Sequence, residues 1–325
     1  MLAFLIRRLF QSAIVLLVVG AASFGMFRFI GDPVNNMLGQ ERTQADIDQL
    51  RDRLGLDKPF IVQYGIFLKN AAQGNFGVSY RQGRPVAEII AERAPATLEL
   101  ALVSGVMALV IGIGLGVLTA IKRRSILSSV IMALSLIGVS LPTFLIGILL
   151  IYIFAVQLDW LPSFGRGETT NIGGWSTGFL TKSGLVALIL PAITLGLYQM
   201  TLIMRIVRSE MLEVLRQDYI RFARARGLKE RSINFRHALK NTLVPVITVT
   251  GLQMGSIIAF AIITETVFQW PGLGLLFINA VQYVDIPVMA AYLMLISVMF
   301  VAINVVVDLL YFAIDPRLSI ERATQ

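Results

Sequence analysis

Few residues of this chain are able to do covalent or metal chemistry. The sequence contains no cysteine, which excludes disulfides, thiolate ligands and cysteine nucleophiles. It contains a single histidine, His237, which excludes multi-histidine metal sites. No lysine follows a glycine, so the phosphate-binding loop G-x-x-x-x-G-K-[ST] is absent. We therefore expect a chain that is not an enzyme, holds no metal, and does not bind ATP through such a loop.

Three acidic residues lie within or at the ends of long apolar segments: Glu99, Glu265 and Asp308. A charge in hydrocarbon is costly, so such residues are candidates for function. None lies near the middle of its segment, which favours hydrogen bonding between helices as the simpler interpretation. Glu265 is the best functional candidate of the three, because we expect it to face the outside mouth of a passage. A polar, methionine-containing face at Gln253 and Met254 fits a substrate passage and a subunit interface equally well.

The composition indicates a membrane protein. Of the 325 residues, 56% are hydrophobic and 15% are charged, and mean hydropathy is +0.75. An ordinary soluble domain is about 25% charged. The composition therefore disfavours a soluble globular fold and excludes a disordered chain. The net charge of +8 is interpreted as lysine and arginine on the cytoplasmic side of a membrane rather than as a nucleic-acid surface.

Six apolar segments reach the roughly 20 residues that a helix needs to cross a bilayer. They are Leu9–Phe27, Leu100–Ile121, Ile126–Leu158, Ser183–Met204, Leu243–Thr264 and Val288–Val307, the last extending to about Ile314. The third is long enough to require tilt or a bend, and Pro142 predicts the bend because proline removes a backbone donor. The sequence thus predicts an all-α polytopic protein with both termini on one side.

Charge asymmetry predicts which side that is. With the N-terminus inside, the inner segments carry seventeen basic and six acidic residues, whereas the outer segments carry eleven of each. Both termini are therefore expected in the cytoplasm. The expected regions are 1–95 (first span plus external loop), 96–314 (five spans with an inner loop at 205–242) and a tail at 315–325. In the external loop, short helices are expected at Thr43–Leu54 and Val62–Asn70.

The inner loop has the pattern of an ordered docking surface. Three helices are expected, at Val207–Arg216, Tyr219–Arg226 and Lys229–Asn241, and Gly227 suits a helix end that needs left-handed dihedrals. Ten of its 38 residues are basic, more than topology alone needs. Elsewhere, the small-residue pairs Gly112/Gly116 and Gly251/Gly255 predict close packing between helices.

Several motifs, taken in order, resemble one family of permeases. The motifs are Gly31–Pro33, Leu54–Pro59, Gly74–Ser79, Pro95–Leu100, Asp218–Leu228 with Arg236–Asn241, Glu265–Phe268 with Trp270–Gly274, and Asp308–Tyr311 with Asp315–Arg317. Together they resemble the B-type permease of the dipeptide/oligopeptide/nickel branch of ABC importers. The chain departs from the general Glu-Ala-Ala signature, which reads Arg221-Phe222-Ala223 here, as is typical of this branch.

The resemblance implies the type I ABC importer transmembrane fold, in the bacterial inner membrane, surrounded by lipid. It implies a C-type permease, two ABC ATPase subunits that bind ATP and magnesium, and an external substrate-binding protein as partners, with no nucleic acid and no cofactor on this chain. Residues carried over to the ATPase-coupling loop are Asp218, Tyr219, Arg221, Ala223, Arg224, Ala225, Arg226, Gly227 and Leu228.

The expected activity is import of di- or oligopeptides or related small solutes. The alternative is an ion-coupled secondary transporter. That class needs charges or broken helices near the membrane centre, and often an inverted repeat. Neither is clear in the sequence, where Pro142 and Pro191 are the only central helix breakers.

Overall fold

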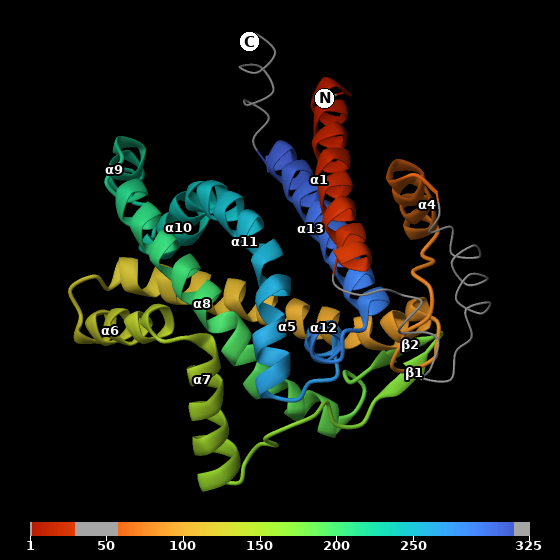
Figure 1. The fold of residues 1–325 in the computed structure, drawn as a ribbon. Coiled ribbons are helices and arrows are strands. Elements are labelled where there is room, and N and C mark those ends of the chain that lie inside the picture. The colour runs from red at the N-terminus through yellow and green to blue at the C-terminus, as the bar shows by residue number, and fades with distance from the viewer. Residues whose placement is uncertain (1, 30–57, 315–325) are drawn as a thin grey trace. The chain divides into compact units, whose positions relative to one another are not determined.

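The computed structural model describes residues 2–29 and 58–314, whose regular structure is helical apart from one small hairpin (Figure 1). The turn expected at Gly31–Pro33, the helix expected at Thr43–Leu54 and the tail at 315–325 lie outside the described residues. The chain divides into two compact units, one made of Met1–Pro95 with Pro271–Ala302 and one of Ala96–Trp270 with Ile303–Gln325.

The first unit is built from helices at both ends of the chain. Its described helices are α1 (Leu2–Phe29), α4 (Phe60–Ala72), the start of α5 (Val86–Ile121), α12 (Leu273–Gln282) and the larger part of α13 (Ile286–Ile314). α4 lies beside α1 (Figure 1). At the start of α13, the buried Asp285 accepts hydrogen bonds from the Ser79 hydroxyl and from the backbone N–H of Tyr80 (3.1 Å). This carboxylate ties the turn that follows α4 to α13.

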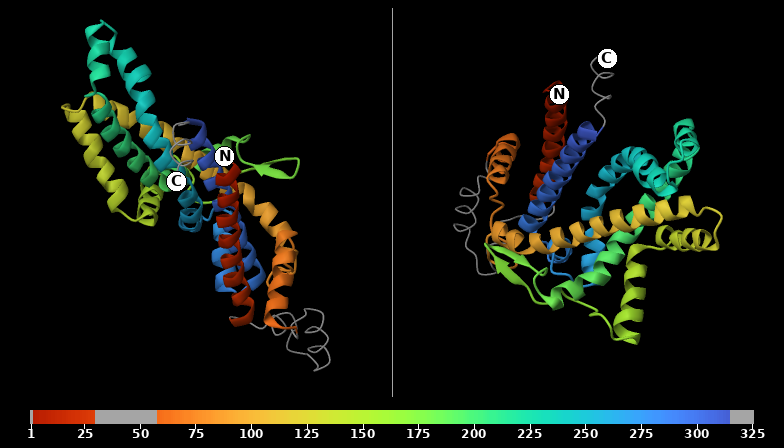
Figure 2. Two further views of the ribbon diagram at one scale, coloured as in Figure 1. Left: turned by 90° about the horizontal axis from the view of Figure 1, so that it is seen from above. Right: turned by 180° about the vertical axis from the view of Figure 1, so that it is seen from behind.

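The second unit contains the middle of the chain. Its elements are the rest of α5, α6 (Ile126–Ser140), α7 (Thr143–Leu150), η1 (Ile151–Gln157), β1 (Thr170–Ile172), β2 (Trp175–Thr177), α8 (Lys182–Val214), α9 (Asp218–Ala225), α10 (Glu230–Ser232), η2 (Ile233–Ala238) and α11 (Leu239–Val267). α8 and α11 run side by side and form the centre of this unit (Figures 1 and 2). α8 is continuous into the inner loop, as expected for Val207–Arg216.

The third expected span is broken at its proline. α6 ends at Ser140, α7 begins at Thr143, and their axes differ by 112° (Figure 1). Proline disfavours the helical conformation of the residue before it, and Leu141 is extended, with φ −89° and ψ 138°. The predicted bend at Pro142 is confirmed, and it is sharp enough to divide the span into two helices.

The glycine pair of α5 allows two backbones to approach closely. A Cβ placed on Gly116 would lie 2.6 Å from the Val207 Cβ and 2.8 Å from the Met204 carbonyl oxygen of α8. A Cβ on Gly112 would lie 2.9 Å from the Met200 carbonyl oxygen. These positions have no room for a larger residue, so the predicted packing of the pair between helices is confirmed.

The hairpin corrects the expectation of a purely helical chain. β1 and β2 pair antiparallel, with Thr170 opposite Thr177, and the turn between them has positive φ at Gly173 and Gly174. Strands of three residues are too short to produce an alternating pattern, so the hydropathy of the sequence gave no indication of them.

The described residues contain four helices that are long and apolar enough to cross a membrane, or five if α6 and α7 are counted as one broken span. The four lie at Ile6–Met26, Val86–Ile121, Lys182–Val214 and Ile286–Val307. The fifth expected span lies within α11, whose described apolar stretch is the shorter Gly255–Val267. The count of six spans therefore stays a prediction.

Candidate functional site

The loop at 205–242 forms a short helix that ends in a glycine cap. α9 covers Asp218–Ala225, one residue earlier than expected at each end. Gly227 follows with φ +75°; its N–H donates to the Arg224 carbonyl (2.9 Å), and the N–H of Leu228 donates to the Ala223 carbonyl (3.3 Å). This pair of bonds defines a Schellman motif, which needs left-handed dihedrals at the position that Gly227 occupies.

The apolar face of α9 is anchored in the protein. Ile220 is completely buried and Ala223 nearly so. Both belong to a hydrophobic core whose other buried members are Ala108, Val117, Ala120, Ile203, Val207, Met211, Ile233, Ala238 and Val246. These residues come from α5, α8, η2 and α11. α9 is therefore held by packing against several helices and is not a free loop.

The opposite face of α9 is open and combines aromatic with charged side chains. Phe222 is 65% exposed, and the Arg226 guanidinium carbon lies 5.8 Å from the centre of its ring. Tyr219 is also exposed, and its hydroxyl accepts a hydrogen bond from the Asn241 amide (2.7 Å). The Arg221 side chain is highly exposed. Tyrosine and arginine are enriched in the residues that dominate binding energy at protein interfaces, so this face has the chemistry of a docking surface.

Polar contacts stiffen the base of this surface. Arg224 pairs with Glu230 at 2.8 Å, which links α9 to α10. At the inner end of α8, Arg208 donates to the Ser128 hydroxyl (2.7 Å) and to the Thr119 carbonyl (3.2 Å). The helix that leads into α9 is thereby tied to both sides of the α5–α6 turn.

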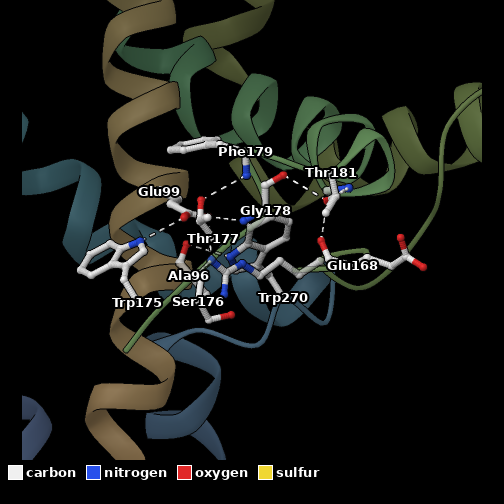
Figure 3. Close-up of polar contacts among 12 residues, drawn as sticks. Ala96, Glu99, Glu168, Trp175, Ser176, Thr177, Gly178, Phe179, Thr181 and Trp270 are labelled. Carbon is white, nitrogen blue, oxygen red and sulfur yellow. Dashed lines mark hydrogen bonds and ion pairs between the residues drawn. The ribbon is translucent and has the colours of Figure 1, made fainter. Parts of the chain in front are cut away.

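A second polar cluster surrounds Glu99 (Figure 3). Its carboxylate pairs with the buried Arg166 at 2.6 Å and accepts from the Trp175 indole N–H (3.2 Å) and the Gly178 backbone N–H (3.3 Å). Arg166 also donates to the Ser176 carbonyl (2.7 Å). Burial of the pair excludes water, so each group depends on the other for its charge to be tolerated. The cluster attaches the hairpin segment to α5. Glu99 is thus a hydrogen-bonding residue, as favoured, but its partners lie in the hairpin segment and not on another helix.

Glu265 is completely buried in the same unit. It accepts a hydrogen bond from the Thr97 hydroxyl (2.5 Å), so its carboxylate does not face an open passage in this structure. Close by along the chain, the buried Trp270 donates from its indole N–H to the Ala96 carbonyl (2.9 Å; Figure 3). These two contacts fasten the end of α11 to α5.

A pocket of about 500 Å³ opens at the broken span. Its lining residues come from the α6–α7 break, α8 and α11: Leu141, Pro142, Thr143, Phe144, Leu195, Tyr198, Gln199, Ser256, Ile257, Phe260 and Ile263. Most are apolar, and the Gln199 amide donates to the Ser256 hydroxyl (2.9 Å) inside it. The pocket combines a hydrophobic wall with a few uncharged polar groups, a composition typical of small-molecule sites.

The expected coupling residues are thus brought together on one helix and its cap. Glu265 is distant in sequence from them, and Gln253 and Met254 lie within α11 but their side chains fall outside what the structure describes. No group of three or more His, Cys, Asp or Glu side chains in residues 2–29 and 58–314 is placed to hold a metal ion. Sequence reasoning missed Arg166 as the partner of Glu99, because 67 positions separate them and no local pattern links them.

Comparison with known families places this arrangement in a class of membrane transport subunits. The family described as binding-protein-dependent transport system inner membrane component matches residues 112–320. The family of N-terminal regions of such membrane components matches residues 1–101. The chain therefore belongs to the inner membrane components of binding-protein-dependent transport systems. It is a permease subunit of an ABC importer and is not itself an enzyme.

Relatives align along almost the whole chain. The dipeptide transport system permease protein DppB of Alkalihalophilus pseudofirmus is 39% identical, with 98% of this chain and 100% of that protein covered. The oligopeptide transport system permease protein AppB of Bacillus subtilis is 42% identical, with the same coverage. The glutathione transport system permease protein GsiC of Escherichia coli is 37% identical over 98% of this chain and 99% of that protein.

A solved structure shares the fold. An inward-facing MetNI methionine ABC transporter chain superimposes with a TM-score of 0.56 at 20% identity, covering 70% of this chain and 96% of that chain. The likeness supports the helical architecture of an ABC importer transmembrane region, and at this identity it carries no information on substrate.

Proposed function

We propose that this chain forms half of the translocation pathway of an importer for di- and oligopeptides. The relatives named above are permeases for dipeptides, oligopeptides and glutathione, all of which carry peptide or peptide-like amide bonds. A homologous C-type permease completes the pathway, and an external binding protein delivers the substrate. Six helices cross the inner membrane, with both termini in the cytoplasm and the 31–96 segment connecting the first two spans.

In this proposal α9 is the coupling helix. The observation that carries it is the exposed Tyr219, Phe222 and Arg226 face set on the buried Ile220 anchor. Two ABC ATPase subunits bind ATP and magnesium, and one receives this face in a groove. When the ATPases close on ATP, the anchored helix moves with them and carries α8 along. The transmembrane halves then rotate as rigid bodies and expose the passage to the other side.

The passage is assigned to the α8–α11 side of the second unit. Gln253, Met254 and Glu265 belong to it in this proposal. The pocket at the α6–α7 break supports the assignment, because its α11 lining begins at Ser256, within one turn of Gln253. Glu265 contributes only when its contact with Thr97 separates.

Site-directed crosslinking tests the coupling assignment. The chain has no native cysteine, so Phe222→Cys introduces a single reactive thiol, and Ile126→Cys on α6 provides an exposed control away from α9. We expect Phe222→Cys, but not Ile126→Cys, to form a crosslink with an ATPase subunit in membranes. An equal yield at both positions contradicts docking at α9.

Uptake measurements test the substrate class. Cells that lack the chain are complemented with it and supplied with a labelled dipeptide, a labelled tetrapeptide or a labelled nickel chelate. We expect the peptides to enter only in complemented cells. Entry of the chelate without either peptide refutes the peptide assignment and leaves the coupling assignment intact, because crosslinking reports on α9 alone.

A further inference from the structure

The α4 helix packs against the membrane-spanning part of α1. The Phe24 ring lies 5.1 Å from Phe60, 5.8 Å from Tyr64 and 5.8 Å from Phe67, measured between ring centres. The Tyr64 hydroxyl donates to the Leu17 carbonyl at 2.6 Å. The two helices lie side by side in Figures 1 and 2. Every one of these contacts falls on Leu17–Phe24 of α1.

That stretch of α1 lies at membrane depth. The candidate span of α1 is Ile6–Met26, so Leu17 is near its middle. At a rise of 1.5 Å per residue, Leu17 is about 14 Å and Phe24 about 3 Å below the Met26 end. The hydrocarbon core is about 30 Å thick. The contacts of α4 therefore cover the half of the core nearer the C-terminal end of α1.

The composition and exposure of α4 match that depth. Residues 59–68 contain no charged side chain, and Lys58 and Lys69 flank them. Phe60, Ile61 and Val62 are all exposed, and Ile61 is the most exposed of the three at 74%. In water, three successive exposed large apolar side chains would be unfavourable. Next to lipid acyl chains, the same exposed apolar side chains are in a favourable apolar environment.

Two polar side chains of α4 and the backbone at its C-terminal end have partners within the protein. The Gln63 amide donates to the Lys58 carbonyl (2.7 Å), and the Tyr64 hydroxyl uses the α1 backbone. At the end of the helix, the N–H of Gly74 donates to the Ala71 carbonyl (3.0 Å), and the N–H of Asn75 donates to the Asn70 carbonyl (2.9 Å). Hydrocarbon provides no partners for backbone groups, so internal satisfaction is a condition for entering it.

We propose that α4 is a membrane-embedded helix that enters one leaflet beside α1 without crossing it, with Phe60, Ile61 and Val62 in contact with lipid acyl chains. The segment between the first two spans is then not wholly aqueous. α4 and α1 form a pair anchored in the same leaflet, and Gly20 of α1 provides the flat surface against which the Leu68 side chain lies.

Fluorescence quenching by lipids tests this placement in the assembled transporter. A bimane probe is attached to Ile61→Cys, with Val18→Cys on α1 as the membrane control and Gln82→Cys as the aqueous control; all three positions are exposed on this chain. The transporter is reconstituted in vesicles that contain lipids nitroxide-labelled on the acyl chain. We expect quenching at positions 61 and 18 and its loss at position 82. We also expect a membrane-impermeant maleimide to leave Ile61→Cys unlabelled.

Two other outcomes overturn the proposal. Rapid maleimide labelling at position 61 without lipid quenching places α4 in water. If position 61 is neither labelled nor quenched, α4 lies against another protein subunit. Peptide uptake by the same variants is measured in parallel, so failure of the lipid contact is distinguished from failure of the transporter.

Discussion

The cap of α9 offers the sharpest test of coupling, because its glycine is required by backbone geometry alone. Gly227 has φ +75°, and a Cβ added there would meet no atom within 4 Å. A substitution thus introduces no clash, only the cost of left-handed dihedrals, about 1–2 kcal/mol for an ordinary L-residue. This corresponds to a factor of roughly 5–30 in the equilibrium ratio of capped to uncapped conformations.

Three substitutions at position 227 are expected to differ in effect, because their residues differ in how well they tolerate positive φ. Gly227→Ala should reduce peptide uptake and substrate-stimulated ATP hydrolysis by at most that factor, and Gly227→Val should abolish both, because a β-branched residue is a genuine outlier at positive φ. Gly227→Asn should retain most activity, since asparagine tolerates these dihedrals. All three variants should reach the membrane in normal amounts. Normal uptake by Gly227→Val at normal expression refutes the role of the cap, and equal loss in the asparagine and valine variants refutes the dihedral argument.

Three further predictions concern stability, measured as thermal unfolding of the purified transporter. Gly116→Ala should destabilise by about 1–3 kcal/mol through overpacking against α8, whereas Gly114→Ala, which would meet nothing within 4 Å, should be neutral or stabilising; equal effects contradict the packing account. Glu99→Gln or Arg166→Met alone should cost about 3–5 kcal/mol by leaving a buried charge unpaired. The double variant should cost less than either single variant, and simple additivity contradicts their coupling. Trp270→Phe should cost about 0.5–1.5 kcal/mol by removing the buried hydrogen bond to the Ala96 carbonyl, and an unchanged melting temperature contradicts that contribution.

Local patterns predicted the parts of this molecule whose geometry is set locally. The helix at Asp218–Ala225 was anticipated within one residue, because an amphipathic stretch followed by Gly227 specifies both a helix and its end. Pro142 likewise identified the position of the bend. The 112° angle was beyond prediction, since it depends on how α7 packs against α8 and α11.

Long-range pairing could not be anticipated. Glu99 was recognised as unusual in its segment, but its partner Arg166 belongs to a loop without a pattern of its own. The same holds for Glu265 and Thr97, whose contact joins helices 168 positions apart. The expected exposure of Glu265 to the outer mouth differs from its complete burial, because the sequence places a residue along a helix but not the neighbour that covers it.

The unbroken helix α8 limits how a displacement at α9 can reach the pocket. At 1.5 Å per residue, its 33 residues form a rod about 50 Å long. The rod carries Gln199 at the pocket on one section and Met211, behind α9, on another. No loop between them absorbs displacement, and Arg208 clamps the rod to its neighbours. In the proposed mechanism, displacement of the C-terminal end of α8 tilts the whole helix, with about 0.9 Å of travel across its full length for each degree. The proposed coupling then needs no intermediate element between α9 and the pocket.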